Sequence, residues 1–320
     1  MSDTPTYYGR SAVKPSDWRW LIVSYFFVGG LAGAAQLIAT IVDLRGHHRD
    51  RTLVSAGRYV ALLGALASPV LLTADLKTPS RWYNMLRVFR HTSPMSIGSW
   101  TLLTFGTSSG LAALGQVGAD VFGWRPARAV ARLSGVPAAL SGGLLAIYTG
   151  SLLSATSTPL WAVAYRWLPA MFGLSATVTA SAALSLVLDR AGGAQLSKRR
   201  LERLALVATI LELVVVRKVD AEWKRNHVHA ALEDRPLRVA YNAGVMGLGI
   251  VMPLLVHLLQ ALTGRELRSA SMVASVAALA GGFMQRTVVL MAGKHSAEQP
   301  QDYFANAQPY RVRDLTGAPV

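Results

Sequence analysis

The chain has 320 residues, no cysteine and a formal net charge of +15. Charged residues make up 15 % and hydrophobic residues 52 %, whereas soluble domains are roughly a quarter charged, so the composition argues against a soluble globular protein. Without thiolates the chain has no iron–sulfur cluster, cysteine-rich zinc site, cysteine nucleophile or disulfide of its own. Its basic residues lie in short segments between apolar blocks, which favours contacts with membrane lipid over nucleic-acid binding.

Long apolar blocks predict an all-α integral membrane protein, because a bilayer crossing takes about 20 mostly apolar residues. We expect eight transmembrane helices, at Trp20–Val42, Leu53–Ala74, Ser96–Val117, Leu133–Ala155, Leu160–Leu188, Leu201–Val216, Val239–Leu262 and Ala270–Ala292. An extramembrane segment (residues 1–19) precedes this membrane domain (residues 20–292), and an extramembrane tail (residues 293–320) follows it. Eight crossings place both termini on one side, here called the terminal side. Lys and Arg are too evenly divided between the two sides to orient the chain.

Charged residues inside the expected spans are candidates for proton transfer, because ionisable groups are costly in a membrane. Glu212 interrupts the sixth span, Arg286 lies in the last, and Asp75 closes the second on the terminal side. A simple ion pair, for example between Glu212 and Arg286, is the alternative role. The sixth span is short, and we expect its helix to continue past both ends, where Arg203 and Lys218 can reach the membrane surface.

The terminal-side loop Asp75–Met95 combines apolar and basic side chains. Trp82 belongs to an apolar face that Arg81 and Arg87 flank. This pattern predicts an amphipathic helix, which either lies in the membrane interface or docks a partner subunit.

Histidines and tyrosines narrow the possible chemistry. Of seven histidines, only His257 lies inside an expected span, which argues against a transmembrane haem held by two histidines. We find no P-loop or zinc-protease motif. Tyr25 and Tyr148 lie within spans, toward the terminal side. Such a tyrosine either anchors its helix at the membrane interface or donates a hydrogen bond to a quinone carbonyl.

One stretch of the sequence resembles a known family. Ala74–Leu76, Pro79, Arg81, Asn84–Phe89 and Thr92–Trp100 together are similar to the NrfD/PsrC family, the membrane subunits of polysulfide-reductase-like oxidoreductases. Further matches lie along nearly the whole chain, at Tyr7–Arg10, Thr158–Trp161 and Gly281–Gly282 with Arg286.

The resemblance implies an eight-helix subunit built as two four-helix bundles, about residues 20–155 and 160–292. It implies a chain with no haem or metal of its own that binds menaquinone or ubiquinone in the cell (inner or cytoplasmic) membrane. The implied partners are an iron–sulfur (ferredoxin-like) subunit and a molybdenum- or tungsten-pterin catalytic subunit. Such a chain is a subunit of an oxidoreductase complex rather than a free-standing enzyme.

The resemblance also implies roles for single residues. Tyr148 matches the quinone-site tyrosine of the family, whereas Ile22 and Tyr25 stand where polysulfide-reductase-type members have an Asn and a His. Glu212 and Arg286 resemble buried polar positions proposed for proton transfer.

We therefore expect Tyr25 and Tyr148 to donate to a quinone, with Gly150 leaving room for its ring. Asp75, Glu212 and Arg286 are the candidates for proton transfer, and Arg81, Arg87 and Trp82 those for docking the iron–sulfur subunit. A proton-translocating or transporter-like subunit and a purely structural anchor are the alternative functions.

Overall fold

The computed structural model describes residues 13–14, 16–46, 48–192, 195–264 and 268–299, and in these residues it contains helices and no strands. The first four long helices are α1 (Trp20–Arg45), α2 (Arg51–Ala74), α3 (Pro94–Val121) and α4 (Arg125–Ser154). The short α5 (Pro159–Val163) is followed by two long helices, α6 (Leu168–Ala191) and α7 (Gln195–Arg225). Next comes one continuous helical run made of α8 (Arg235–Val239), η4 (Ala240–Val251) and α9 (Met252–Thr263). The last helix is α10 (Arg268–Glu298). The short 3-10 helices η1 (His48–Asp50), η2 (Pro79–Leu86) and η3 (His229–Leu232) lie between them.

Six helices of the described residues are long and apolar enough to cross a membrane, as expected for an integral membrane protein. They are α1, α2, α4, α6, the run Arg235–Thr263 and α10. The expected extension of the sixth segment is confirmed, because α7 runs from Gln195 to Arg225.

The expected single span Leu160–Leu188 is wrong. The structure breaks it into α5 and α6, which the turn at residues 164–167 separates. A proline lies in the first turn of each helix, Pro159 in α5 and Pro169 in α6. Proline fits a helix start but has no N–H to bond to the preceding turn, so the second proline begins a new helix.

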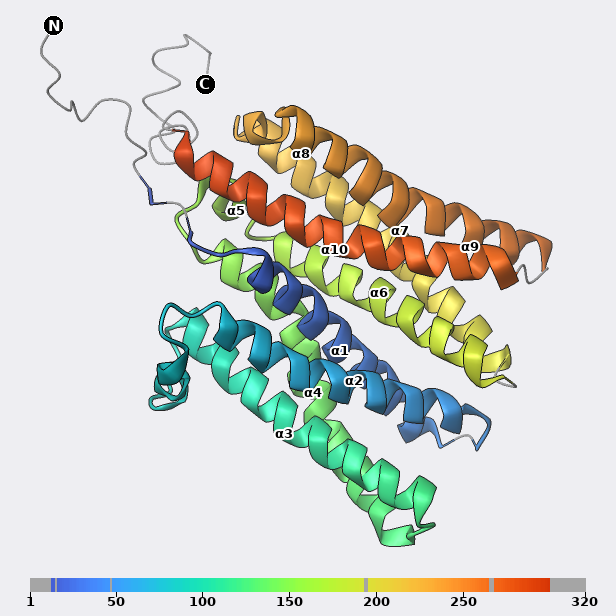
Figure 1. Ribbon diagram of the computed structural model, residues 1–320. Helices are drawn as coiled ribbons and strands as arrows, with labels where there is room; N and C mark the ends of the chain where they lie inside the picture. The colour runs from blue at the N-terminus through green and yellow to red at the C-terminus, as the bar shows by residue number, and fades with distance from the viewer. Residues whose placement is uncertain (1–12, 15, 47, 193–194, 265–267, 300–320) are drawn as a thin grey trace, which may run out of the picture.

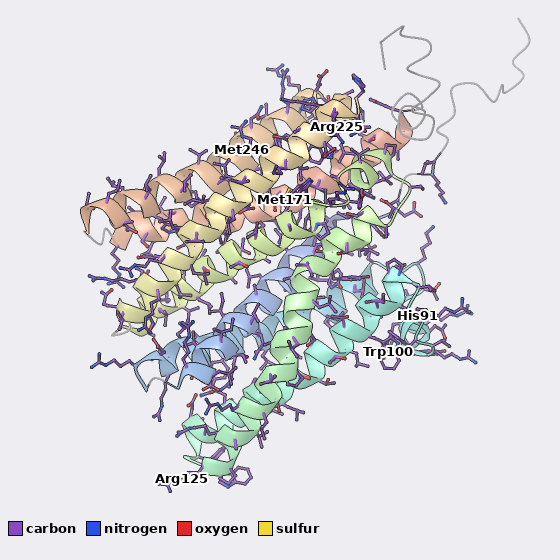
Figure 2. All side chains as sticks on the ribbon, turned by 180° about the vertical axis from the view of Figure 1, so that it is seen from behind. His91, Trp100, Arg125, Met171, Arg225 and Met246 are labelled. Atoms are coloured by element: carbon purple, nitrogen blue, oxygen red, sulfur yellow. The ribbon has the colours of Figure 1, made fainter. Side chains whose placement is uncertain are left out.

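The long helices lie side by side along one common direction (Figure 1). Helix α1 packs on α2 and α4, α3 packs on α4, and α6 contacts α1, α4, α7 and α10. The start of α1 and the end of α10 meet, because Lys294 donates a hydrogen bond to the carbonyl of Trp18. Figure 2 shows His91 and Arg225 toward this end and Arg125 at the opposite one.

Glycine allows two helix pairs to touch backbone to backbone. A Cβ on Gly33 of α1 would lie 2.1 Å from the carbonyl oxygen of Gly142 in α4. A Cβ on Gly281 of α10 would lie 2.0 Å from the Cα of Gly249 in η4. Membrane helices associate through such close approach because lipid competes equally well for apolar side chains.

The loop Asp75–Met95 does not form the expected amphipathic α-helix. It contains only the 3-10 turn η2, and from Arg87 onward the chain is irregular up to Pro94. Ser93 then caps α3, since its hydroxyl accepts a hydrogen bond from the Ser96 N–H at 3.4 Å. Two prolines therefore bound the loop and limit its helix to the turns of η2.

Candidate functional site

Tyr25 and Tyr148 line one small cavity of about 40 Å³ at the end where α1 begins. Its walls come from the start of α1, the ends of α2 and α4, the first turns of α3, and η2. The lining residues are Trp18, Ile22, Tyr25, Phe26, Leu72, Met85, Met95, Gly98, Ser99, Tyr148 and Leu152. We call it the tyrosine cavity. Ile22 and Tyr25, the two positions that depart from the family pattern, both face it.

The first turns of α3 hold Tyr148 in place. Its hydroxyl donates a hydrogen bond to the carbonyl oxygen of Pro94 at 2.8 Å. A Cβ on Gly98 would lie 2.1 Å from both Cζ and the hydroxyl oxygen of Tyr148, so only glycine lets the ring lie there. Since a phenol has one proton, Tyr148 in this geometry presents a lone pair to the cavity rather than the donor that we expected.

Tyr25 differs from Tyr148 in its hydrogen bonding. Its side chain is 3 % exposed, and among the described residues its hydroxyl has no hydrogen-bond partner. It is therefore the tyrosine whose proton is free for a ligand in the cavity.

A second, larger cavity of about 210 Å³ adjoins the first and is almost entirely apolar. We call it the side cavity. It lies between α2, α3 and η2, and Leu72, Met85 and Ser99 line both cavities. Val70 and Leu103 beside it are exposed apolar side chains, as expected of a surface that faces lipid. The two cavities therefore follow one another from the lipid-facing side of η2 to the tyrosines, with the flexible side chain of Met85 between them.

Gly150 is not among the residues that line either cavity. A Cβ there would lie 2.6 Å from the carbonyl oxygen of Leu168 and 2.8 Å from the Cα of Pro169. The missing side chain lets α4 pack against the start of α6, which accounts for this glycine without a ligand.

Glu212 and Arg286 lie in a separate polar cluster between α6, α7 and α10. Both are buried, with exposed fractions of 3 % and 1 %. Glu212 accepts a hydrogen bond from Gln285 Nε2 at 2.9 Å. Arg286 donates to Ser175 Oγ at 3.1 Å. In the described part of the chain no ion pair joins Glu212 to Arg286, so the direct pairing that we considered does not form.

Arg286 also reaches the wall of the tyrosine cavity. Its Nε donates to the carbonyl oxygen of Phe26 at 3.3 Å, and another nitrogen donates to that of Gly282 at 2.7 Å. Its guanidinium lies over the rings of Phe27 and Phe172 at 5.7 and 5.3 Å from their centroids. Backbone dipoles and aromatic faces thus stabilise this buried cation.

The other expected residues lie on the surface around η2. Arg81 and Arg87 are exposed, and Trp82 is about half exposed while it lines the side cavity. Asp75, directly after α2, is half-buried, and burial raises the pKa of its carboxyl while the positive charges of Arg19 and Lys294 oppose that shift.

Sequence reasoning missed a polar network at the opposite end of α1 to α4. Arg58 is buried and its Nη2 lies 2.9 Å from Asp43 Oδ2. Arg58 also donates to Gln116, whose Nε2 donates to both carboxylate oxygens of Asp120 at 2.9 Å. The sequence feature that could have indicated this network is Arg58 itself, a charged residue within the apolar segment Leu53–Ala74.

Within the described residues, no group of three His, Asp or Glu side chains is arranged to hold a metal ion. A family model described as "Polysulphide reductase, NrfD" matches residues 11–297. Comparison with curated proteins gives no match.

Proposed function

Since the chain belongs to the NrfD family of polysulphide reductases, which points to membrane subunits of quinone-linked oxidoreductases, we propose that it exchanges electrons between a docked iron–sulfur subunit and membrane quinone. The observation that carries this proposal is the pair of adjacent cavities that share Leu72, Met85 and Ser99, one apolar and on the side of lipid, the other lined by two buried tyrosines.

The proposed topology has eight crossings in two four-helix bundles, about residues 20–155 and 160–292, flanked by the extramembrane segments 1–19 and 293–320. The lengths of α3 and α7 support it, with 28 and 31 residues. At about 1.5 Å per residue, each is longer than the roughly 30 Å of a hydrocarbon core.

The two cavities fit different parts of a quinone. The side cavity suits an isoprenoid tail and the edge of a ring, because its lining is apolar. The tyrosine cavity, at about 40 Å³, is far below the roughly 300–1,000 Å³ of typical ligand sites. A quinone ring at the tyrosines would need more room than this, and a movement of the flexible Met85 side chain, which lines both cavities, would supply it.

The two tyrosines have complementary roles in this proposal. The Tyr25 hydroxyl would donate to a carbonyl of the oxidised quinone. The Tyr148 hydroxyl, whose proton is bonded to Pro94, would accept the O–H of the reduced quinone. A bound quinone supplies a couple of two electrons and two protons. Asp75, half-buried at the same end of the molecule, is the group that we propose to hold and pass on a proton.

Docking is proposed on the surface that surrounds η2. Arg81, Arg87 and Trp82 are exposed there, and Trp82 also lines the side cavity. An iron–sulfur (ferredoxin-like) subunit bound to this surface would bring its cluster close to the tyrosines and link the chain to a molybdenum- or tungsten-pterin catalytic subunit.

The test uses a side chain that both cavities share. Ser99→Phe puts a ring into their common wall, and Thr104→Phe makes the same change at an exposed position of α3. We expect the purified Ser99→Phe complex to lose its retained quinone and its quinone turnover, and the Thr104→Phe complex to keep both. Equal quinone content in the two assembled complexes would reject these cavities and leave a purely structural anchor.

Proton translocation is a second candidate, because Glu212, Gln285 and Arg286 form a buried polar cluster within the span-forming helices. Arg286 connects this cluster to the tyrosine cavity through Phe26. Acidification measured in vesicles during turnover separates this function from electron transfer alone.

A further inference from the structure

A third cavity, of about 120 Å³, lies between α7 and α9 at the end of the molecule opposite the tyrosines. We call it the basic cavity. Arg199, Glu202 and Arg203 of α7 line it, together with His257 and Gln260 of α9. Arg199 and Arg203 are one helical turn apart, so their side chains leave the same face of α7.

His257 supplies an unused polar atom at the base of the basic cavity. Its ring is 7 % exposed, and its Nδ1 has no hydrogen-bond partner among the described residues. Buried polar atoms normally have partners, because an unpaired one costs free energy. As one tautomer of imidazole carries a proton on Nδ1, this atom can donate to a ligand.

Among the described residues that line the cavity, the one carboxylate already has partners. Glu202 accepts a hydrogen bond from Ser271, and Lys198 Nζ lies 3.9 Å from its Oε1. Arg203 has no ion pair among the described residues, so its charge can interact with an anion in the cavity. A planar guanidinium suits the oxygens of a phosphate, to which it can donate two parallel hydrogen bonds.

The apolar surface around the basic cavity indicates that such a phosphate belongs to a lipid headgroup. The side chains next to the cavity are exposed and apolar, namely Leu204, Leu255, Leu259 and Leu262. Acyl chains can cover this surface while a headgroup enters beside Arg203. We propose that the basic cavity binds the phosphate of an anionic phospholipid, with Arg203 and His257 as its donors.

Native mass spectrometry of the purified complex tests this proposal, with phosphatidylglycerol and phosphatidylcholine as probes. The variant is Arg203→Gln, and Arg45→Gln is the control, an exposed arginine at the same end of the molecule in the last turn of α1. Losing a charge-assisted hydrogen bond should weaken phosphatidylglycerol retention about tenfold in Arg203→Gln. His257→Phe should weaken it too, and the control should match the wild type.

Three results would overturn the proposal. The first is equal retention of phosphatidylglycerol by the wild type, Arg203→Gln and His257→Phe. The second is an equal loss in Arg45→Gln, which would make the effect one of overall charge. The third is inorganic phosphate binding as tightly as phosphatidylglycerol, which would mean that the ligand is a free anion and not a lipid.

Discussion

Gly98→Ala is the sharpest probe of the tyrosine cavity, because it adds one methyl group behind Tyr148. The new Cβ would lie 2.1 Å from the ring Cζ and from the hydroxyl oxygen, whereas ordinary contacts begin at 3.4 Å. The ring must therefore move by roughly 1 Å. The hydrogen bond to Pro94, now 2.8 Å long, would then be stretched beyond the usual range of O–H···O hydrogen bonds, roughly 2.5–3.0 Å.

Two opposed effects set the change in stability. Overpacking a filled site costs about 1–3 kcal/mol. Replacing glycine by alanine within a helix returns about 1 kcal/mol. Gly110→Ala on the same helix isolates the second effect, because nothing lies within 4 Å of its added Cβ. We expect the two variants to differ by about 1–3 kcal/mol in unfolding free energy, with Gly98→Ala the less stable.

The assays are thermal unfolding of the purified complex and steady-state quinone turnover in membranes with equal amounts of assembled complex. The displaced ring should occupy the tyrosine cavity, so quinone turnover should fall in Gly98→Ala and stay unchanged in Gly110→Ala. Identical turnover and identical unfolding in the two variants would refute both the position of Tyr148 and its role.

Tyr148→Phe keeps the ring and removes the hydroxyl, and with it one proposed hydrogen bond to the ligand, worth about 0.5–1.5 kcal/mol, so the dissociation constant for the reduced quinone should rise about two- to tenfold. Ligand titration checks this, and wild-type affinity would make Tyr148 an interface anchor. Glu212→Gln keeps the hydrogen-bonding shape but cannot titrate; unchanged proton uptake during turnover would leave it a structural role. Arg81→Glu and Arg87→Glu should each release the iron–sulfur subunit from membranes, whereas Arg166→Glu should not, and cosedimentation measures the difference.

The helices could be predicted from the sequence because each long apolar run satisfies the same physical requirement, a crossing of the hydrocarbon core. The break between α5 and α6 was missed since the turn between them, Ala164–Trp167, is as apolar as its neighbours apart from Arg166. Mean hydropathy over a span-length window does not reveal so short a turn. The two prolines that lie in the first turns of α5 and α6 were the local signal.

The site could be predicted only in part, because its geometry depends on contacts between distant residues. Tyr25 and Tyr148 were chosen for residue type and depth, and the structure brings both to one cavity. The hydrogen bond from Tyr148 to Pro94 spans 54 positions of the chain. Nothing near either residue signals it. The structural role of Gly98 likewise depends on the Tyr148 ring that packs against it, which the local sequence does not show.

The position of Arg286 links the two candidate functions physically. Its charge has no carboxylate within ion-pair distance among the described residues, and in a low-dielectric interior such a charge acts over a longer range than in water. It is bonded on one side to the carbonyl of Phe26, which lines the tyrosine cavity, and on the other to Ser175, in the helix that packs on α7 beside Glu212. A negative charge in the tyrosine cavity and a negative charge on Glu212 would compete for this one guanidinium. In the two proposed functions, electron arrival in the cavity would therefore favour proton uptake at Glu212, without any movement of the helices.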